Sequence, residues 1–239
     1  MVGRAIERHD PTHLIVTFDP PPPTFRHKMY PDYKANRPPA PEGLIEDCER
    51  VRERLESLDV VFCTVQGYEA DDVLGTLATR ASVSGFQTMI LTSDLDLLQL
   101  VSPITEVEVF SQYWAKRSFD VEAAKRRFGG LAPENIPDYK ALAGDTSDNL
   151  PGVPGIGAVA ATAVLGEYGN LDKVYENLDS ISELPIRGAR RVSRLLAEHR
   201  EQAFLMRTLT TIVCDVPVDV DIDGALIEES GLQAVEALD

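Results

Sequence analysis

Residues 60–92, VVFCTVQGYEADDVLGTLATRASVSGFQTMILT, place an apolar run, a helix-like segment and a second apolar run in succession. The runs at 60–65 and 87–92 are short and bounded by turn residues, which predicts two buried strands. The segment at 69–84 predicts a helix that Gly85 closes. A strand, a helix and a strand in this order are typical of a parallel α/β sheet.

The same alternation extends over the first half of the chain. We expect a strand at 12–18, helices at 2–9 and 41–58, a short helix at 95–101 and a strand near 105–110. This pattern predicts a three-layer α/β domain with a mostly parallel sheet over residues 1–118.

The second half, residues 119–239, predicts a helical domain because strand signals nearly stop near residue 118. The expected helices cover 119–128, 133–143, 157–168, 171–177 and 187–209, and the acidic segment after residue 215 is expected to be extended.

Acidic side chains follow three of the predicted strands, and a fourth acidic pair precedes a Gly/Pro-rich run. Because the carboxyl ends of parallel strands meet at one edge of a sheet, we expect these carboxylates to converge. A cluster of hard oxygen ligands favours Mg²⁺ or Mn²⁺, which indicates a metal-dependent enzyme acting on phosphate. The candidate ligands are Asp19, Glu69, Asp71, Asp72, Asp94, Asp96, Asp145 and Asp148.

Each acidic group also has a structural interpretation. Acids at 69–72 complement the dipole of the helix that begins there. Asp94 could cap a short helix beside a surface acid, Asp96. The composition of 144–149, GDTSDN, is that of a capped loop. The repeated position of the acids after strands favours metal ligation.

Two further segments carry features suited to nucleic acid. The run 144–157, GDTSDNLPGVPGIG, ends at a predicted helix, and its small residues let the backbone approach a phosphate. The Pro-rich segment 19–41 reads as a long loop, or arch, in which basic side chains alternate with aromatic ones. Those side chains are Arg26, Tyr30, Tyr33, Lys34 and Arg37.

The charge balance at first opposes a nucleic-acid partner, since the formal net charge is −16. Residues 215–239 hold eight acids and no Lys or Arg, which is half of that excess. Basic residues gather instead at 26–37, 116–127 and 187–200. No apolar run is long enough for a membrane span, so no membrane partner is expected. Three widely spaced cysteines are read as reduced thiols of a cytoplasmic protein.

Five segments together resemble the 5′-nuclease domain of bacterial DNA polymerase I and its relatives, the 5′–3′ exonuclease and flap endonuclease family. They are HLIVTFDP (13–20), PTFRHKMYPDYKANRPP (23–39), GYEADDVLGTLA (67–78), LTSDLDLLQLV (91–101) and ALAGDTSDNLPGVPGIG (141–157). The resemblance implies a PIN-like domain followed by a helix–three-turn–helix module. It also implies hydrolysis of DNA 5′ flaps or ends with two metal ions, in replication or repair, beside a fused or cooperating polymerase.

The resemblance also implies roles for single residues. Asp19, Glu69, Asp71, Asp72, Asp94 and Asp96 would form one metal group, and Asp145 and Asp148 would complete the second. Arg26, Lys34 and Arg37 match the family's catalytic arch cations, and Tyr33 matches its base-stacking residue. The hairpin residues Gly152, Val153, Gly155, Ile156 and Gly157 would hold duplex backbone, together with a K⁺ ion.

The sequence departs from the family pattern in two places. Family members begin with a strand that ends in another catalytic Asp, so we expect a fragment, a misassigned start or a degenerate homologue. Family members also carry lysines soon after Gly157, where this chain reads AVAATA. These departures keep a non-catalytic DNA-junction binder as an alternative. A second alternative is a haloacid-dehalogenase-type phosphatase, whose motifs are superficially matched by 94–96 and 144–149.

Overall fold

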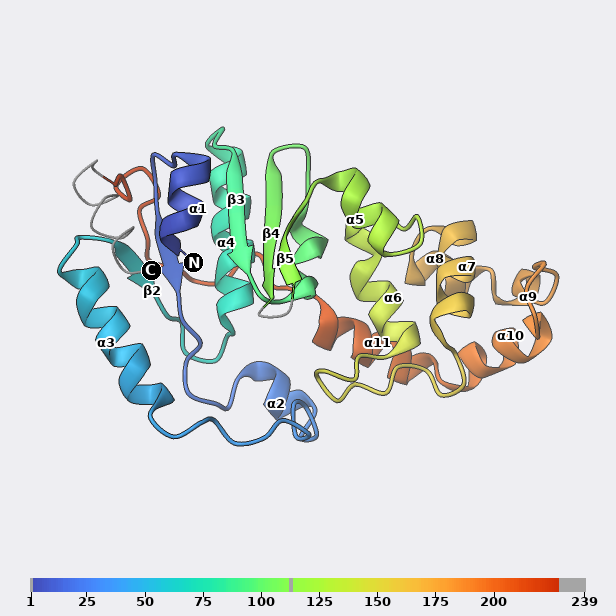
Figure 1. Cartoon of the computed structure of the whole chain (residues 1–239). Coiled ribbons are helices and arrows are strands. Elements are labelled where there is room, and N and C mark those ends of the chain that lie inside the picture. Colours follow the sequence, from blue (N-terminus) through green and yellow to red (C-terminus); the bar gives the residue numbers. More distant parts are fainter. Residues whose placement is uncertain (1, 112–113, 228–239) are drawn as a thin grey trace. The chain divides into compact units, whose positions relative to one another are not determined.

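The computed structural model describes residues 2–111 and 114–227 (Figure 1). By internal contacts it divides into two compact units. Unit 1 comprises Met1–Phe25, Pro38–Leu77 and Cys214–Asp239, and unit 2 comprises Arg26–Arg37 and Ala78–Val213. The boundary predicted between residues 118 and 119 rests on where strand signals stop in the sequence and not on internal contacts, so it stays a prediction. Within the described ranges, no helix has the length and apolar character needed to cross a membrane.

Unit 1 is built on two parallel strands, β1 (Ile15–Thr17) and β2 (Val61–Cys63). The helices α1 (Val2–His9) and α3 (Leu44–Glu56) accompany them, and α4 (Ala70–Val83) begins in this unit. A small apolar core forms where these elements meet. Its members are Ile6, Leu55 and Val60, with Leu14, Val16, Phe18, Leu58, Phe62 and Ile227 packed against them.

The sheet of unit 2 pairs β3 (Thr88–Thr92) with β4 (Thr105–Ser111) in parallel, as the alternation predicts. A third strand, β5 (Trp114–Phe119), pairs antiparallel with β4 and was not predicted. Its sequence, WAKRSF, has neither an apolar run nor a polar–apolar alternation, so the backbone pairing with β4 defines the strand. The predicted short helix after β3 is a 3₁₀ helix, η1 (Leu95–Leu100).

The rest of unit 2 is helical, which confirms the helical character predicted beyond residue 118. The elements are α2 (Phe25–Met29), α5 (Val121–Arg127), η2 (Pro133–Asn135), α6 (Ile136–Ala143), α7 (Ala158–Tyr168), α8 (Leu171–Glu176), α9 (Leu178–Ile181), α10 (Ala189–Glu198) and α11 (Arg200–Thr210). The single helix expected over 187–209 is two helices, because the chain breaks at His199. The short α2 and α9 were not predicted.

The core of unit 2 lies where α6 packs against α7 and α11. Leu142, Leu165 and Met206 are almost completely buried there. The Thr210 hydroxyl donates to the Pro137 carbonyl at 3.0 Å and ties α11 to α6. This packing fixes the end of α6, from which the loop of residues 144–150 leaves.

The acidic segment after residue 214 forms no helix or strand up to residue 227, and Leu226 makes an isolated bridge with His13. Residues 215–227 thus agree with the extended segment expected from the sequence, and residues 228–239 lie outside the described ranges.

Candidate metal centre and nucleic-acid interface

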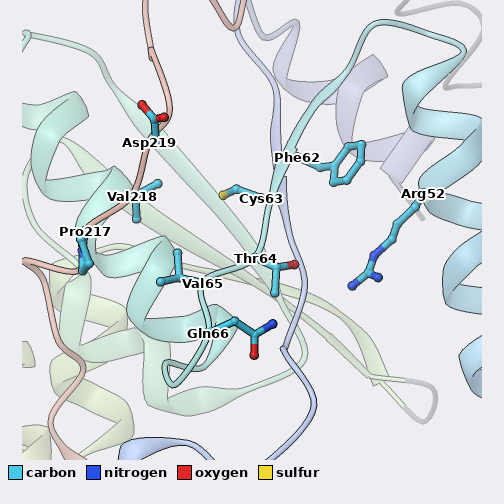
Figure 2. A pocket seen from close by; sticks show the side chains of 9 residues that line it. All are labelled: Arg52, Phe62, Cys63, Thr64, Val65, Gln66, Pro217, Val218 and Asp219. Carbon is cyan, nitrogen blue, oxygen red and sulfur yellow. The ribbon is translucent and has the colours of Figure 1, made fainter.

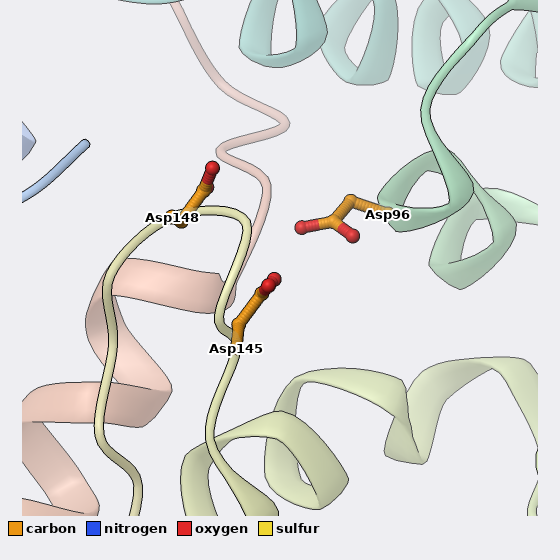
Figure 3. A group of neighbouring side chains, drawn as sticks. All are labelled: Asp96, Asp145 and Asp148. Carbon is orange, nitrogen blue, oxygen red and sulfur yellow. The ribbon is translucent and has the colours of Figure 1, made fainter. Parts of the chain in front are cut away.

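Three carboxylates of unit 2 converge. Asp96 comes from η1, and Asp145 and Asp148 come from the loop after α6 (Figure 3). One ligand oxygen of each lies within 4.8 Å of the others, and no other such group of acidic, His or Cys side chains occurs among the described residues. Asp145 and Asp148 are buried and Asp96 is half-buried. Hard oxygen donors at this spacing suit a divalent cation such as Mg²⁺ or Mn²⁺.

A cation from the protein itself already lies among these acids. The Lys140 ammonium group, on α6, donates to Asp145 Oδ2 at 2.6 Å and also to Asp96 Oδ1. Its side chain is only 11% exposed. Because an ammonium group occupies a position between two carboxylates, the cluster accommodates positive charge, and its donor set fits a metal ion. The sequence analysis missed Lys140, although a lone lysine inside the apolar helix IPDYKALA is a recognisable signal.

The electrostatics of Asp145 reflect these partners. Burial alone would raise the pKa of this carboxyl, but Lys140 and the Ser147 donors outweigh it and hold the pKa below its usual value. Ser147 donates its amide at 2.9 Å and its hydroxyl at 2.5 Å to Asp145 Oδ1. Asp145 therefore stays ionised and is shaped for a cation.

Asp148 is held by the arch segment, residues 26–37, which belongs to the same unit. The Arg37 guanidinium donates to Asp148 Oδ1 at 2.7 Å, and the Tyr33 hydroxyl donates to Asp148 Oδ2 at 3.0 Å. Asn36 Nδ2 donates to the Thr146 carbonyl at 2.7 Å. The arch and the carboxylate loop thus form one hydrogen-bonded element.

A cavity of about 570 Å³ opens beside the cluster. Asp94, Asp96 and Asp145 line it together with Lys140 and Arg127. Asp94 caps η1, since its Oδ1 accepts the Asp96 amide at 2.9 Å. It lines the cavity without joining the group of three, so its role as a ligand stays a prediction.

The remaining candidate ligands lie in unit 1, at the start of α4. Asp19 Oδ1 accepts the Ala70 amide at 2.7 Å, and Asp72 Oδ2 accepts the Glu69 amide at 3.0 Å. The structure therefore places Asp19 next to the acids of 69–72. Both acids satisfy amides at the start of α4. Asp72 does so from the first turn of the helix, the structural alternative considered from the sequence, and Asp19 does so from the chain after β1. Ligation by Asp19, Glu69, Asp71 and Asp72 remains a prediction.

Two of the arch residues, Arg26 and Tyr33, are buried. Arg26 is 3% exposed, and its guanidinium donates to the carbonyls of Leu209 at 2.8 Å and Thr211 at 2.9 Å. These contacts form a buried cross-link at the end of α11, and the catalytic role that the family resemblance implies for Arg26 stays a prediction. Tyr33 is also 3% exposed, so its ring presents little surface for base stacking in this arrangement. The Lys34 ammonium group lies 4.9 Å from the centroid of that ring.

The hairpin of residues 152–157 uses its residues in two ways. Val153 and Ile156 are 1% and 5% exposed, so their side chains belong to the core. Gly152 has a φ of 63°, and a Cβ there would lie 2.3 Å from the Gly144 amide nitrogen. This contact is possible only for glycine and holds the hairpin against the carboxylate loop. Gly157 precedes α7, whose first turn carries exposed Val159 and no cation.

A separate cavity of about 520 Å³ lies in unit 1, beyond the end of β2 (Figure 2). Arg52, Phe62, Cys63 and Asp219 are among the residues that line it. Burial raises the pKa of the Cys63 thiol. The three cysteines form no disulfide. This cavity contains none of the candidate ligands.

Comparison with known proteins assigns the family. A model described as the N-terminal resolvase-like domain of 5′-3′ exonuclease matches residues 1–129, and one described as its C-terminal SAM fold matches residues 131–231. The chain belongs to the 5′-3′ exonuclease family. The fold is thus a resolvase-like PIN domain followed by a helical SAM-like domain, as the sequence predicted.

Individual relatives in sequence and solved structures of similar fold accord with this assignment. DNA polymerase I of Chloroflexus aurantiacus is 40% identical over 98% of this chain and 24% of the relative, and that of Pseudomonas aeruginosa is 42% identical over 93% and 24%. The chain spans about a quarter of the length of these relatives. The fold is similar to that of the T5 D15 protein co-crystallised with metal ions, at a TM-score of 0.70, 22% identity and coverage of 99% of this chain and 88% of that one. The catalytic core of Rad2 in complex with DNA substrate gives a TM-score of 0.56 at 18% identity, covering 87% and 66%.

Family membership also bears on the motif at 94–96. The N-terminal family model includes these residues, which places the Asp-Leu-Asp motif within a 5′-3′ exonuclease. The haloacid-dehalogenase-type phosphatase therefore loses its support.

Proposed function

We propose that this chain is a structure-specific 5′-nuclease that hydrolyses DNA phosphodiesters at 5′ flaps and 5′ ends. Three things support the proposal: membership of the 5′-3′ exonuclease family, the carboxylate cluster, and the neighbouring hairpin. The solved structures with a similar fold include one described as bound to divalent metal ions and one in complex with DNA.

The observation that carries the proposal is the convergence of Asp96, Asp145 and Asp148 beside the cavity. These carboxylates would hold one Mg²⁺ or Mn²⁺ ion, and the acids Asp19, Glu69, Asp71, Asp72 and Asp94 are the candidates for a second. Two bound metal ions would lower the pKa of a water molecule and stabilise the leaving oxygen of the phosphodiester.

The protein's own groups would bind and orient the DNA. Two cations of the arch, the exposed Arg37 and the half-buried Lys34, would meet the phosphate that approaches the carboxylates. The amide groups at the start of α7, which follows the hairpin, would meet the duplex backbone, with K⁺ at the hairpin. We also infer that the chain works beside a polymerase, fused or separate, in the cytoplasm at the nucleoid.

The test is cleavage of a labelled 5′-flap duplex by the purified chain with Mg²⁺, with Mn²⁺ and with EDTA. Asp145→Asn should lower the cleavage rate at least a hundredfold, because it removes a charged ligand from the cluster. Glu122→Gln serves as the matched control, since Glu122 is an exposed acid on α5 paired only peripherally with Lys125. Equal rates for Asp145→Asn and wild type would refute the assignment.

A second function, non-catalytic binding of DNA junctions, has its own supporting observation. The acids of the cluster are bound by Lys140, Arg37 and Tyr33, and the first turn of α7 carries no cation. A gel shift of the flap duplex without cleavage in either metal would favour the binder, and cleavage by the purified chain would eliminate it.

A further inference from the structure

Lys140 makes contacts that the proposed nuclease chemistry does not itself require. Its ammonium group lies against two of the three clustered carboxylates, at 2.6 Å from Asp145 Oδ2 and in contact with Asp96 Oδ1. The side chains of Lys140, Asp145 and Asp96 are largely buried, with exposed fractions of 11%, 8% and 15%. Attraction between charges is stronger in such a site than in water, so the ion pairs hold the acids together.

The two oxygens of Asp145 are both in use. Oδ2 accepts from Lys140, and Oδ1 accepts from the amide and the hydroxyl of Ser147. An entering divalent ion must therefore share Asp145 with the ammonium group or displace it. In either case, the fixed positive charge lies within a few ångströms of the ion, and like charges at that distance repel.

We propose that Lys140 is a positioning residue that acts as the cluster's built-in counter-ion, holding Asp96 and Asp145 together without metal and weakening their affinity for a divalent ion. The inference rests on the metal centre of the proposed function. If Lys140 acts in this way, the site at Asp96, Asp145 and Asp148 is the weaker of the two proposed metal sites and binds its ion only at a higher metal concentration.

The experiment measures Mn²⁺ binding to the full chain by electron paramagnetic resonance of free Mn²⁺, without DNA. Lys140→Met removes the charge and keeps an unbranched side chain that is only one atom shorter. We expect it to bind Mn²⁺ at least tenfold more tightly at the weaker site, and to unfold at a lower temperature than wild type when metal-free.

Two variants separate charge from structure. Lys140→Arg keeps the charge and should bind Mn²⁺ within threefold of wild type. Arg127→Met removes a cation that lines the same cavity, whose guanidinium lies 5.7 Å from the Phe128 ring centroid, and should also stay within threefold. A folded Lys140→Met with unchanged or weaker Mn²⁺ affinity would overturn the inference.

A failure to fold is also informative. If metal-free Lys140→Met is unfolded, folding on addition of Mn²⁺ supports the counter-ion role, whereas no folding in Mn²⁺ overturns it. If wild type binds no Mn²⁺, the proposed metal centre itself fails. If wild type binds Mn²⁺ and Lys140→Met does so equally, only the inference about Lys140 fails.

Discussion

Replacing Arg26 by Met should destabilise unit 2 without any DNA present. The guanidinium is 3% exposed and donates to the carbonyls of Leu209 and Thr211 at 2.8 and 2.9 Å. Hydrogen bonds from a charged donor contribute about 1.5–3 kcal/mol each. Met keeps the apolar stem and loses both bonds, so we expect a loss of about 3 kcal/mol in the free energy of unfolding. At about 2–4 °C per kcal/mol for a chain of this size, the melting temperature should fall by about 6–12 °C.

The assay is urea and thermal unfolding followed by far-UV circular dichroism. Arg26→Lys keeps the charge but cannot reach both carbonyls as a planar fork, so it should lose an intermediate amount. Arg37→Met is the control, because the side chain of Arg37 is 46% exposed and its ion pair should contribute about 1 kcal/mol or less. The reasoning is refuted if Arg26→Met keeps wild-type stability and loses only flap binding, the result expected of an arch cation.

Three further predictions concern unit 2. Gly152→Ala should unfold the hairpin, because its Cβ would meet the Gly144 amide nitrogen at 2.3 Å, whereas Gly157→Ala has open space and should melt within a few degrees of wild type. Burial raises the pKa of Tyr175 to about 12 despite Arg200, so stability is intact below pH 10 and is lost as pH rises toward 12. Tyr175→Phe should lose less stability between pH 9 and pH 11, as urea titrations at both values would reveal. Burial also raises the pKa of Asp138 against the Leu171 amide, so stability falls as pH rises through that pKa. Asp138→Asn should therefore gain stability relative to wild type from pH 4 to pH 7, and a constant difference would contradict the prediction.

The elements that the sequence predicted are those whose pattern is local. The helix α4 and the flanking strands β2 and β3 follow from apolar runs and a glycine stop, and all three form. The strand β5 was missed because it owes its existence to pairing with β4. Local pattern carries no information about such a partner.

The candidate site shows the same contrast between features with a local sequence pattern and features that depend on distant residues. The acids that follow strands pointed to Asp96, the acidic pair before the Gly/Pro-rich run pointed to Asp145 and Asp148, and these three do converge. The burial of Arg26 could not be predicted, because its carbonyl partners lie 183 and 185 residues further along the chain. Lys140 was missed for a related reason, since it matters only once folding brings Asp96 beside the end of α6.

The glycine contact between residues 144 and 152 has a consequence for how the molecule tolerates change. Backbone meets backbone there, so the separation between the acidic loop and the hairpin does not depend on any side chain. If the acidic loop binds the scissile phosphodiester and the hairpin binds duplex DNA, this backbone contact sets the distance between the cleaved bond and the bound duplex. Substitutions at other positions would then change the affinity of either element for DNA without changing the distance between the two.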